Sequence, residues 1–224
     1  MFKRYAVFFT PSGPLATFGA AWLGWDSAQG CAVPHPGIDG IDVASVTATP
    51  RKYGLHGTLK APFRLADHAT LARLQAATEA FARQHAAFDI GQLALRYDCG
   101  FIALRPETQS VQLQDFAAAT VKAFDPFRAP LSDAEIARRR RAPLTPRQDQ
   151  QMLQWGYPLI FDDFHFHLTL SGALPQVAGA QVITALHPHL AAIIAQPCVI
   201  DAITLMGEDN DGMFHQIHRY TLTG

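Results

Sequence analysis

The residues best suited to acid–base chemistry occur in two copies of one short phrase. His56 to Leu59 and His167 to Leu170 share the pattern His-x-Thr-Leu, and the second copy follows the first by 111 positions. Each copy lies in a short apolar run bounded by Gly or Pro, which predicts a buried strand. Residues two apart on a strand point to the same face. We therefore expect each histidine to share a face with the threonine of its own copy.

Two imidazoles and two hydroxyls that converge on one small volume could cleave a phosphodiester. Imidazole has an unperturbed pKa of about 6.5, so near neutral pH one ring can be neutral and the other protonated. The neutral ring removes a proton from water, and the protonated ring gives one to the departing sugar oxygen. The hydroxyls of Thr58 and Thr169 would donate to the non-bridging oxygens as charge builds on phosphorus. This chemistry needs no metal and no cofactor.

Both pairs also have a plain structural interpretation. His56 and His167 could be hydrogen-bonded core residues, and the threonines could be ordinary β-branched strand residues. The recurrence of the phrase favours catalysis over that alternative. Which histidine is the acid and which the base is left open.

Four more residues are candidates for substrate binding. Lys60 follows His56 by four positions and would share its face if the strand continues, so we expect it to contact phosphate. Aromatic rings could form cleft walls or stack on a base, with core packing as the alternative for each. These rings belong to Tyr5, Tyr53 and Tyr157.

Two further groups have a functional and a plain interpretation. His165 and His167 would lie on one strand face, which is compatible with a metal site. The first copy has nothing that mirrors His165, so we expect no metal and place His165 at the cleft border or in solvent. We interpret Arg138 to Arg141 as a solvated helix end, with cations near its C-terminus. The alternative is that one arginine reaches over the cleft and clamps an anion.

The elements that must position these residues also occur twice. A strand, a helix, a His strand, a helix and a strand pair follow one another in each copy. The first copy is predicted at 5–9, 15–25, the His56 strand, 67–85 with Asp67 as N-cap, and a hairpin of 88–97 and 101–104. The second copy is predicted at 101–105, 111–124, the His167 strand, 178–195 with a bend at Pro188, and a hairpin of 199–206 and 214–222.

This order predicts one bilobal domain over 1–224. Its halves, roughly 1–99 and 100–224, would pack about a pseudo-twofold axis and bring the two His strands to one cleft. An insertion at 125–158 separates the second helix from the second His strand. We expect this insertion to select substrate as a mobile cover over the cleft.

Composition limits the possible partners. The chain has 224 residues, a net charge of −1 and 49% hydrophobic residues, which excludes a disordered chain and any global basic field for long nucleic acid. A small phosphorylated substrate or a short RNA end remains possible, and we expect a monomer. Cys31, Cys99 and Cys198 have neither metal-ligand nor redox-motif spacing, which favours reduced thiols in a cytoplasmic protein. We find no signal peptide and no run close to the roughly 20 apolar residues of a membrane span.

Several longer phrases carry a family resemblance. They are Arg4 to Pro11, Ala20 to Asp26, Tyr53 to Phe63, Trp155 to Pro158 and Phe166 to Leu170. Together with the paired His-x-Thr they resemble the two-histidine phosphoesterase superfamily, which includes LigT-like 2′-5′ RNA ligase-like proteins and cyclic nucleotide phosphodiesterases. They are most similar to a less characterised branch often encoded with phosphonate-utilisation operons. The resemblance implies an α+β fold with two antiparallel sheets facing across a central cleft, helices outside, and both His-Thr pairs in that cleft.

The predicted function is therefore a metal-independent, cyclic phosphodiesterase-like hydrolase. Its substrate would be a small cyclic phosphodiester, such as a nucleoside or ribose cyclic phosphate. One alternative is a non-catalytic module that binds a phosphorylated metabolite or an RNA end. A second alternative is RNA end-joining, which uses the same groups in reverse.

Overall fold

Apolar runs with period-2 alternation form the strands of one antiparallel sheet. The computed structural model describes residues 2–98 and 100–224, so Cys99 lies outside the described residues. The sheet has seven strands in the order β11-β10-β1-β4-β8-β7-β6. Their bounds are β1 (Arg4–Phe9), β4 (Gly57–Phe63), β6 (Leu93–Asp98), β7 (Phe101–Pro106), β8 (Leu168–Thr169), β10 (Ala202–Glu208) and β11 (Phe214–Thr221). Two short ladders join β2 (Trp25–Asp26) to β3 (Cys31–Ala32) and β5 (Phe88–Asp89) to β9 (Val199–Ile200).

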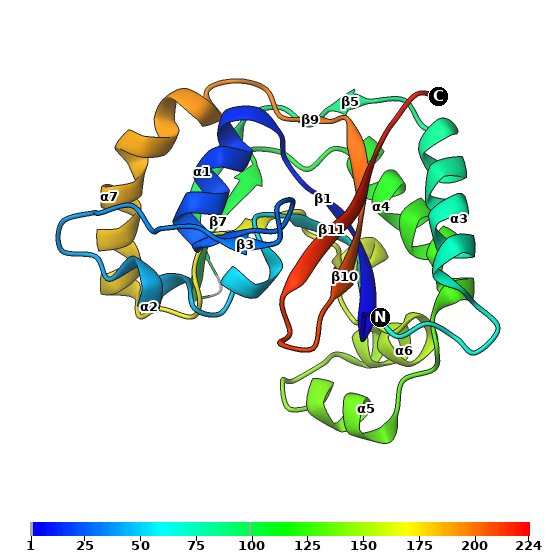
Figure 1. Cartoon of the computed structure of the whole chain (residues 1–224). Helices are drawn as coiled ribbons and strands as arrows, with labels where there is room; N and C mark the ends of the chain where they lie inside the picture. The colour runs from blue at the N-terminus through cyan, green and yellow to red at the C-terminus, as the bar shows by residue number, and fades with distance from the viewer. Residues whose placement is uncertain (1, 99) are drawn as a thin grey trace.

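Helices cover the outside of this sheet. They are α1 (Gly13–Leu23), α2 (Val43–Thr47), α3 (Leu71–Arg83), α4 (Val111–Phe124), α5 (Asp133–Arg139), α6 (Pro146–Trp155) and α7 (Gln176–Ile194). Single 3₁₀ turns occur at η1 (Arg51–Tyr53), η2 (Asp125–Phe127) and η3 (Phe161–Asp163). Figure 1 shows α7 and α3 at opposite ends of the molecule, with the sheet between them. The α+β class, the antiparallel pairing and the outer helices agree with the prediction.

Helix ends follow local capping chemistry. A capping box formed by Ser132 and Glu135 opens α5. The predicted N-cap Asp67 is wrong, because Thr70 caps α3 by accepting a hydrogen bond from the backbone N–H of Arg73. A turn closed by a bond from the Ala69 N–H to the Ala66 carbonyl places Asp67 before the helix.

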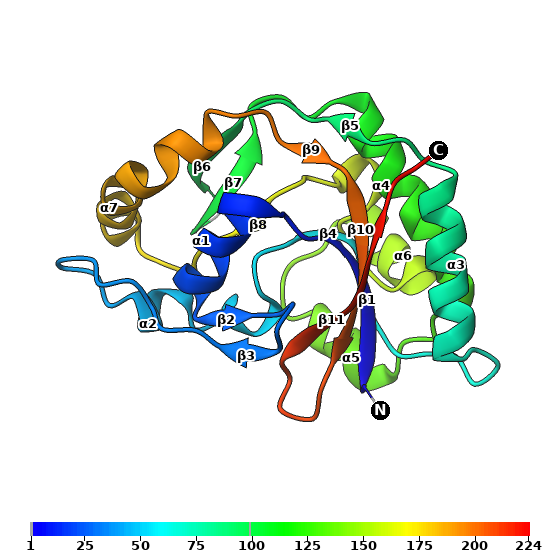
Figure 2. The same cartoon turned by 45° about the horizontal axis from the view of Figure 1, so that its top comes forward.

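The two halves of the chain exchange strands, which corrects the predicted lobe boundary. A single residue pair between β4 and β8 joins the two sides of the sheet. One side contains β1 and β4 together with β10 and β11 from the far end of the sequence. The other side contains β7 and β8 together with β6. A boundary between 99 and 100 therefore cuts the β6–β7 hairpin instead of separating two lobes (Figure 2).

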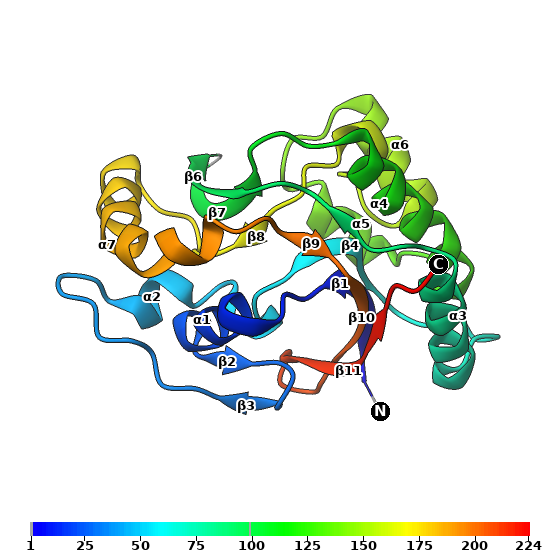
Figure 3. The ribbon, with the colours of Figure 1, turned by 90° about the horizontal axis from the view of Figure 1, so that it is seen from above.

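The strand register shows the pseudo-twofold relationship directly. Gly57 pairs with Leu168, and these residues are equivalent under the 111-position shift of the repeat. In the β5–β9 ladder, residue 88 pairs with 200 and residue 89 with 199, so each pair is the image of the other under the same shift. Figure 3 shows β5 and β9 side by side. The axis thus passes between β4 and β8 and between β5 and β9.

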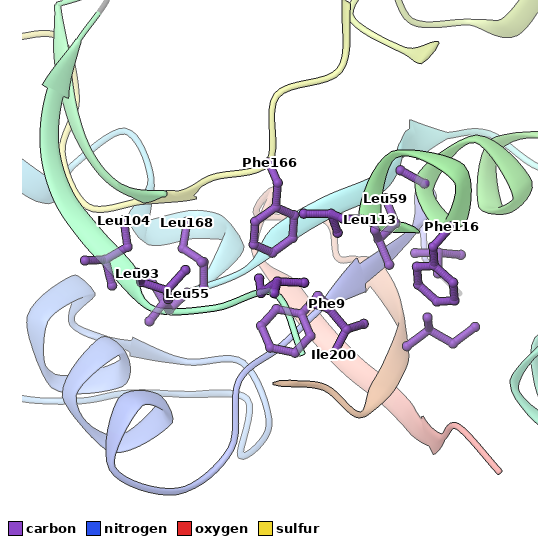
Figure 4. Packing of buried hydrophobic residues seen from close by; sticks show 14 of the residues in the cluster. Phe9, Leu55, Leu59, Leu93, Leu104, Leu113, Phe116, Phe166, Leu168 and Ile200 are labelled. Atoms are coloured by element: carbon purple, nitrogen blue, oxygen red, sulfur yellow. The ribbon is translucent and has the colours of Figure 1, made fainter. Parts of the chain in front are cut away.

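The hydrophobic core lies on one face of the sheet and the site lies on the other. On β1, Val7 and Phe9 belong to the main core. Ala6 and Phe8 belong to a separate small cluster on the opposite face, because strand residues alternate. Phe9 contacts the ring of Phe166, with centroids 6.0 Å apart, near the junction of the two halves (Figure 4).

The last long helix changes one sequence-based expectation. By length and composition alone, α7 is apolar enough to cross a membrane, and 22% of its most apolar stretch is buried. This helix packs against β6 and β7. Pro188 lies inside it, where the sequence predicted a bend.

Candidate active site

The four residues of the repeated phrase gather on one face of the sheet at the β4–β8 junction. Because Gly57 and Leu168 are directly opposed in an antiparallel pair, His56 is opposite Thr169 and Thr58 is opposite His167. Directly opposed residues have Cβ atoms about 5 Å apart, and diagonal residues about 7–8 Å. The register therefore brings two imidazoles and two hydroxyls to one patch about the size of a phosphate ester.

Both histidine rings are held in the same way. The Nδ1 atom of His56 lies 2.9 Å from the Gly54 carbonyl oxygen, and that of His167 lies 2.8 Å from the carbonyl of His165. A carbonyl only accepts, so Nδ1 carries a proton in each ring and Nε2 is the reactive nitrogen. The Thr58 hydroxyl lies 3.2 Å from Nε2 of His56 and donates to it when that ring is neutral.

The surroundings of His56 disfavour its charged form. Its ring stacks on Phe8 with centroids 4.0 Å apart, and Tyr53 lies 5.4 Å away. The pKa of His56 is lowered from 6.5 to about 4, mainly because burial disfavours the charged ring. A charge on His167 acts in the same direction, and the bond to the Gly54 carbonyl opposes both. His56 is therefore neutral at neutral pH and suited to accept a proton.

The repeat explains why the two rings differ. Phe8 is the β1 partner of Thr58, and Ala103 is the β7 partner of Thr169. At equivalent positions, the first copy thus has the large aromatic side chain of Phe8 and the second copy has the methyl group of Ala103. The ring of His167 instead lies 5.6 Å from that of Phe101. The two histidines therefore have different aromatic neighbours.

Two adjoining cavities open on this patch. The first, which we call the cationic pocket, has a volume of about 330 Å³ and is lined by His56, Thr58 and Thr169. The second, which we call the apolar pocket, has a volume of about 240 Å³ and is lined by His167 and again by Thr58. Ala61 and Tyr157 also line both. Together they form a cleft in the range of small-molecule sites, with the two histidines in neighbouring compartments.

Two of the three predicted tyrosines lie at this cleft. Tyr53 lines the cationic pocket, and Tyr157 lies between the two pockets. Tyr5 does not reach the cleft, because it is only 3% exposed and belongs to the main core. Its odd position on β1 places it on the core face, opposite to Phe8.

Lys60 is a second correction among the predicted binding residues. Phe8 pairs with Thr58, whereas Val7 pairs with Lys60. One step along β1 therefore corresponds to two steps along β4. This β-bulge turns Lys60 to the core face. There its ammonium lies 2.8 Å from Asp125 and 3.2 Å from the Val121 carbonyl. Lys60 ties α4 and the following turn to the sheet and does not line either pocket.

Three arginines that were not assigned to the site line the cationic pocket. They are Arg4, Arg138 and Arg139. The sequence holds a partial signal for Arg4, which is four residues before Phe8 and therefore on the same strand face. Arg138 and Arg139 lie in the last turn of α5 and Arg138 is exposed, which agrees with the interpretation as a solvated helix end. Both also line the cationic pocket, so the alternative of an anion clamp stays a prediction.

The insertion at 125–158 forms one wall of the cleft. Its α5 helix carries Arg138 and Arg139, and Tyr157 follows α6. The insertion is attached to the body by the Arg64–Glu135 ion pair at 3.0 Å. Its role as a moving cover stays a prediction.

The donor atoms near the cleft bear on the metal alternative. His165 is exposed and lines the apolar pocket with His167. Within residues 2–98 and 100–224, no group of three or more His, Cys, Asp or Glu side chains is placed to hold a metal ion. The expectation of a metal-independent reaction stays a prediction.

Comparison with known proteins gives a family and two kinds of relatives. The model of a family described as a protein of unknown function (DUF1045) matches residues 58–215. A protein of Janthinobacterium sp. (strain Marseille) named ribose 1,5-bisphosphate phosphokinase PhnN is 37% identical over 218 residues, covering 93% of this chain and 48% of the relative. One of the same name from Laribacter hongkongensis (strain HLHK9) is 33% identical, covering 96% of this chain and 51% of the relative. The chain thus spans about half the length of the curated relatives that it matches.

Two solved structures were also found. One, described as a phosphoesterase, has a TM-score of 0.44 and 12% identity, with 99% of each chain covered. The other, the protein TT0787 of Thermus thermophilus, has a TM-score of 0.43 and 14% identity, with 99% of this chain and 98% of that chain covered.

Proposed function

Because this chain belongs to the DUF1045 family, whose description states no function, its reaction has to be inferred from the site, and we propose that it is a phosphoesterase that opens a small cyclic phosphodiester. The observation that carries the proposal is the cross-strand arrangement at the β4–β8 junction. Two imidazoles, each with Nδ1 bound to a backbone carbonyl, present Nε2 to one cleft. Each imidazole is opposite the hydroxyl of the other copy.

In the proposed mechanism His56 is the base. Its ring is neutral, and Nε2 accepts a proton from the water that attacks phosphorus. A bound phosphate oxygen would take over the Thr58 hydroxyl as acceptor and so release Nε2 of His56 for that water. His167 is the acid. As the bond from phosphorus to the sugar oxygen breaks, His167 gives its Nε2 proton to that oxygen.

The threonines stabilise charge rather than transfer protons. Hydroxyls of Thr58 and Thr169 would donate to the two non-bridging oxygens, where negative charge increases in the transition state. Both line the cationic pocket, and Thr58 also lines the apolar pocket that holds His167. A phosphorus atom placed among these hydroxyls would have a base on one side and an acid on the other.

The substrate would be a ribose or nucleoside cyclic phosphate. The curated relatives are named for ribose 1,5-bisphosphate, which supports a ribose-derived substrate. The sequence has no Gly-x-x-x-x-Gly-Lys-Ser/Thr loop of the kind that binds ATP phosphates in P-loop kinases. The histidine site therefore supports hydrolysis rather than phosphoryl transfer by this chain.

A hydrolysis assay tests the proposal. Nucleoside 2′,3′-cyclic phosphates and ribose 1,2-cyclic phosphate would be incubated with the protein in EDTA, and the ring-opened monoesters measured. Wild-type protein should turn over at least one, and His56→Ala and His167→Ala should each lose about 10²–10⁴-fold in kcat. His187→Ala, on the exposed side of α7, is the matched control and should keep full activity.

Three results would contradict the proposal. Full activity in both cleft variants would remove the histidines from the mechanism. Tight binding of a cyclic nucleotide with no turnover would support the binding module instead, and joining of RNA ends would support the ligase alternative.

A further inference from the structure

The cationic pocket holds more positive charge than the reacting phosphate needs. Three guanidinium groups, those of Arg4, Arg138 and Arg139, line it together with His56. No Asp or Glu is among the described residues of this lining. A cyclic phosphodiester carries one negative charge, which the two imidazoles and two hydroxyls can already bind.

Arg139 is the group most clearly oriented for a ligand. Its guanidinium carbon lies 5.2 Å from the centre of the Tyr157 ring, so the aromatic face holds it at the cleft. Its Nε is buried and has no hydrogen-bond partner within the protein. Burial lowers the pKa of Arg139, which means that its charge is poorly solvated where it stands. A buried donor without a partner is costly, and an incoming anion would satisfy it.

The neighbouring arginines show that this placement is selective. Arg140 forms a two-bond pair with Asp149 at 2.7 and 2.8 Å, and Arg141 is exposed. Of the four consecutive arginines, only Arg138 and Arg139 line the pocket. Arg4 is fixed by Glu208, with one bond of 2.6 Å, so it supplies a rigid donor with little net charge.

On β1, Arg4 stands apart from the residues that contact the catalytic histidine. Arg4 and Phe8 are four residues apart on one face of β1, which corresponds to about 13 Å along the strand. Phe8 stacks on His56, so it marks the catalytic end of the pocket. A second anion bound at the arginine end would therefore be several ångströms from the reacting phosphorus, separated by about the width of a sugar ring.

We infer that the arginine end of the cationic pocket binds a second phosphate of the same substrate, an inference that rests on the proposed function. The substrate class is then a sugar cyclic phosphodiester that also bears a separate phosphate monoester. Arg139 would bind the monoester through its planar fork, with Arg138 and Arg4 at the sides. The monoester would fix the register of the sugar and place the cyclic phosphate between the two His-Thr pairs.

A matched pair of substrates tests this inference. Adenosine 2′,3′-cyclic phosphate and its 5′-phosphorylated form differ only in the monoester. Wild-type protein should prefer the phosphorylated form by about 10- to 100-fold in kcat/KM, the size expected for one charge-assisted pair. Arg139→Ala should lose that preference, because its kcat/KM falls more on the phosphorylated form than on the unphosphorylated form, and Arg139→Lys should recover part of the preference. Arg141→Ala is the matched control and should behave as wild type.

The outcomes separate the two proposals. Equal rates on both nucleotides, or an equal loss on both in Arg139→Ala, would overturn the second-phosphate site and leave the phosphoesterase intact. If wild type hydrolyses neither nucleotide, the phosphoesterase proposal fails for this substrate class. Calorimetry with the His56→Ala protein then decides the subsite on its own. Tighter binding of the 5′-phosphorylated nucleotide, lost in His56→Ala/Arg139→Ala, supports it, and equal affinity overturns it.

Discussion

Gly57 and Leu168 are paired across the β4–β8 junction, and each is the other's counterpart in the repeat. A pair that maps onto itself must lie on the twofold axis. The residues on either side of it, His56 and Thr58 in one strand and His167 and Thr169 in the other, are therefore placed symmetrically on the opposite face. The site is a direct consequence of pairing two copies of one strand about an axis.

Gly57 must be small for this pairing to form. A Cβ atom at this position would lie 2.4 Å from the ring of Phe166, which packs beneath it in the core. We expect Gly57→Ala to lower the free energy of unfolding by about 1–3 kcal/mol, the usual cost of overpacking, and to reduce activity because β4 shifts. Chemical denaturation and the hydrolysis assay would measure both effects. Gly37→Ala is the control, since a Cβ there meets nothing within 4 Å; an equal loss in both variants would refute the steric explanation.

The sequence was sufficient to predict most of the helices and strands and to find the four residues that gather at the β4–β8 junction. His56 and His167 could be found because the same motif recurs in matched surroundings. Such a motif is local in the sequence, so it can be recognised without knowing how the strands pair. The exchange of β6 with β10 and β11 could not be predicted in this way. Period-2 patterns identify strands but not their partners, and a hairpin can pair with either half.

The misplaced residues have local causes that sequence patterns do not show. The prediction for Lys60 was wrong because a β-bulge after Thr58 turns the following side chain to the other face of the sheet. The bulge is a feature of the pairing of β4 with β1, which the sequence pattern does not show. The prediction for Tyr5 was wrong because Tyr5 is on the same strand face as the buried residues Val7 and Phe9. The alternation of the strand could have indicated this. Arg4 and Arg139 are 135 positions apart, so only the folded chain shows that they share a pocket.

Lys60 should behave as a structural residue. Its side chain is 3% exposed, and its ammonium bonds to Asp125, whose carboxylate also contacts Arg128 at 2.9 Å. Lys60→Met should lower the free energy of unfolding by about 3 kcal/mol, the low end for breaking a buried pair, because Arg128 still compensates Asp125. The kinetic constants should remain near wild type. Denaturation curves and KM would be compared with those of Arg83→Ala, whose exposed pair with Glu79 should matter by less than about 0.5 kcal/mol. A raised KM with unchanged stability would return Lys60 to the substrate site.

The hydroxyl of Thr58 should matter for chemistry and little for folding. It lies 3.2 Å from Nε2 of His56 and lines both pockets. We expect Thr58→Val to reduce kcat by about 10²–10³-fold, because one donor to the developing charge is lost, and Thr58→Ser to restore most of the rate. Steady-state kinetics on the best cyclic phosphate would measure this. A Thr58→Ser variant as slow as Thr58→Val would contradict the assignment, because the hydroxyl alone would then not restore the rate.

The low pKa of His56 predicts how activity and stability change as pH falls. As the proposed base, His56 must be neutral. As pH falls, kcat/KM should therefore stay high until pH nears about 4, instead of decreasing near the ordinary pKa of 6.5.

The lowered pKa of His56 also affects the stability of the fold. The unfolded ring binds a proton as pH falls through 6.5 while the folded ring does not until about 4, so over this window acid favours unfolding. In His56→Gln, which cannot titrate, stability should decline less between those pH values. Denaturation midpoints measured at intervals across this range, with His187→Gln as control, would check it. Parallel curves for His56→Gln and wild type would show that His56 titrates normally, and the assignment of the base would then have to change.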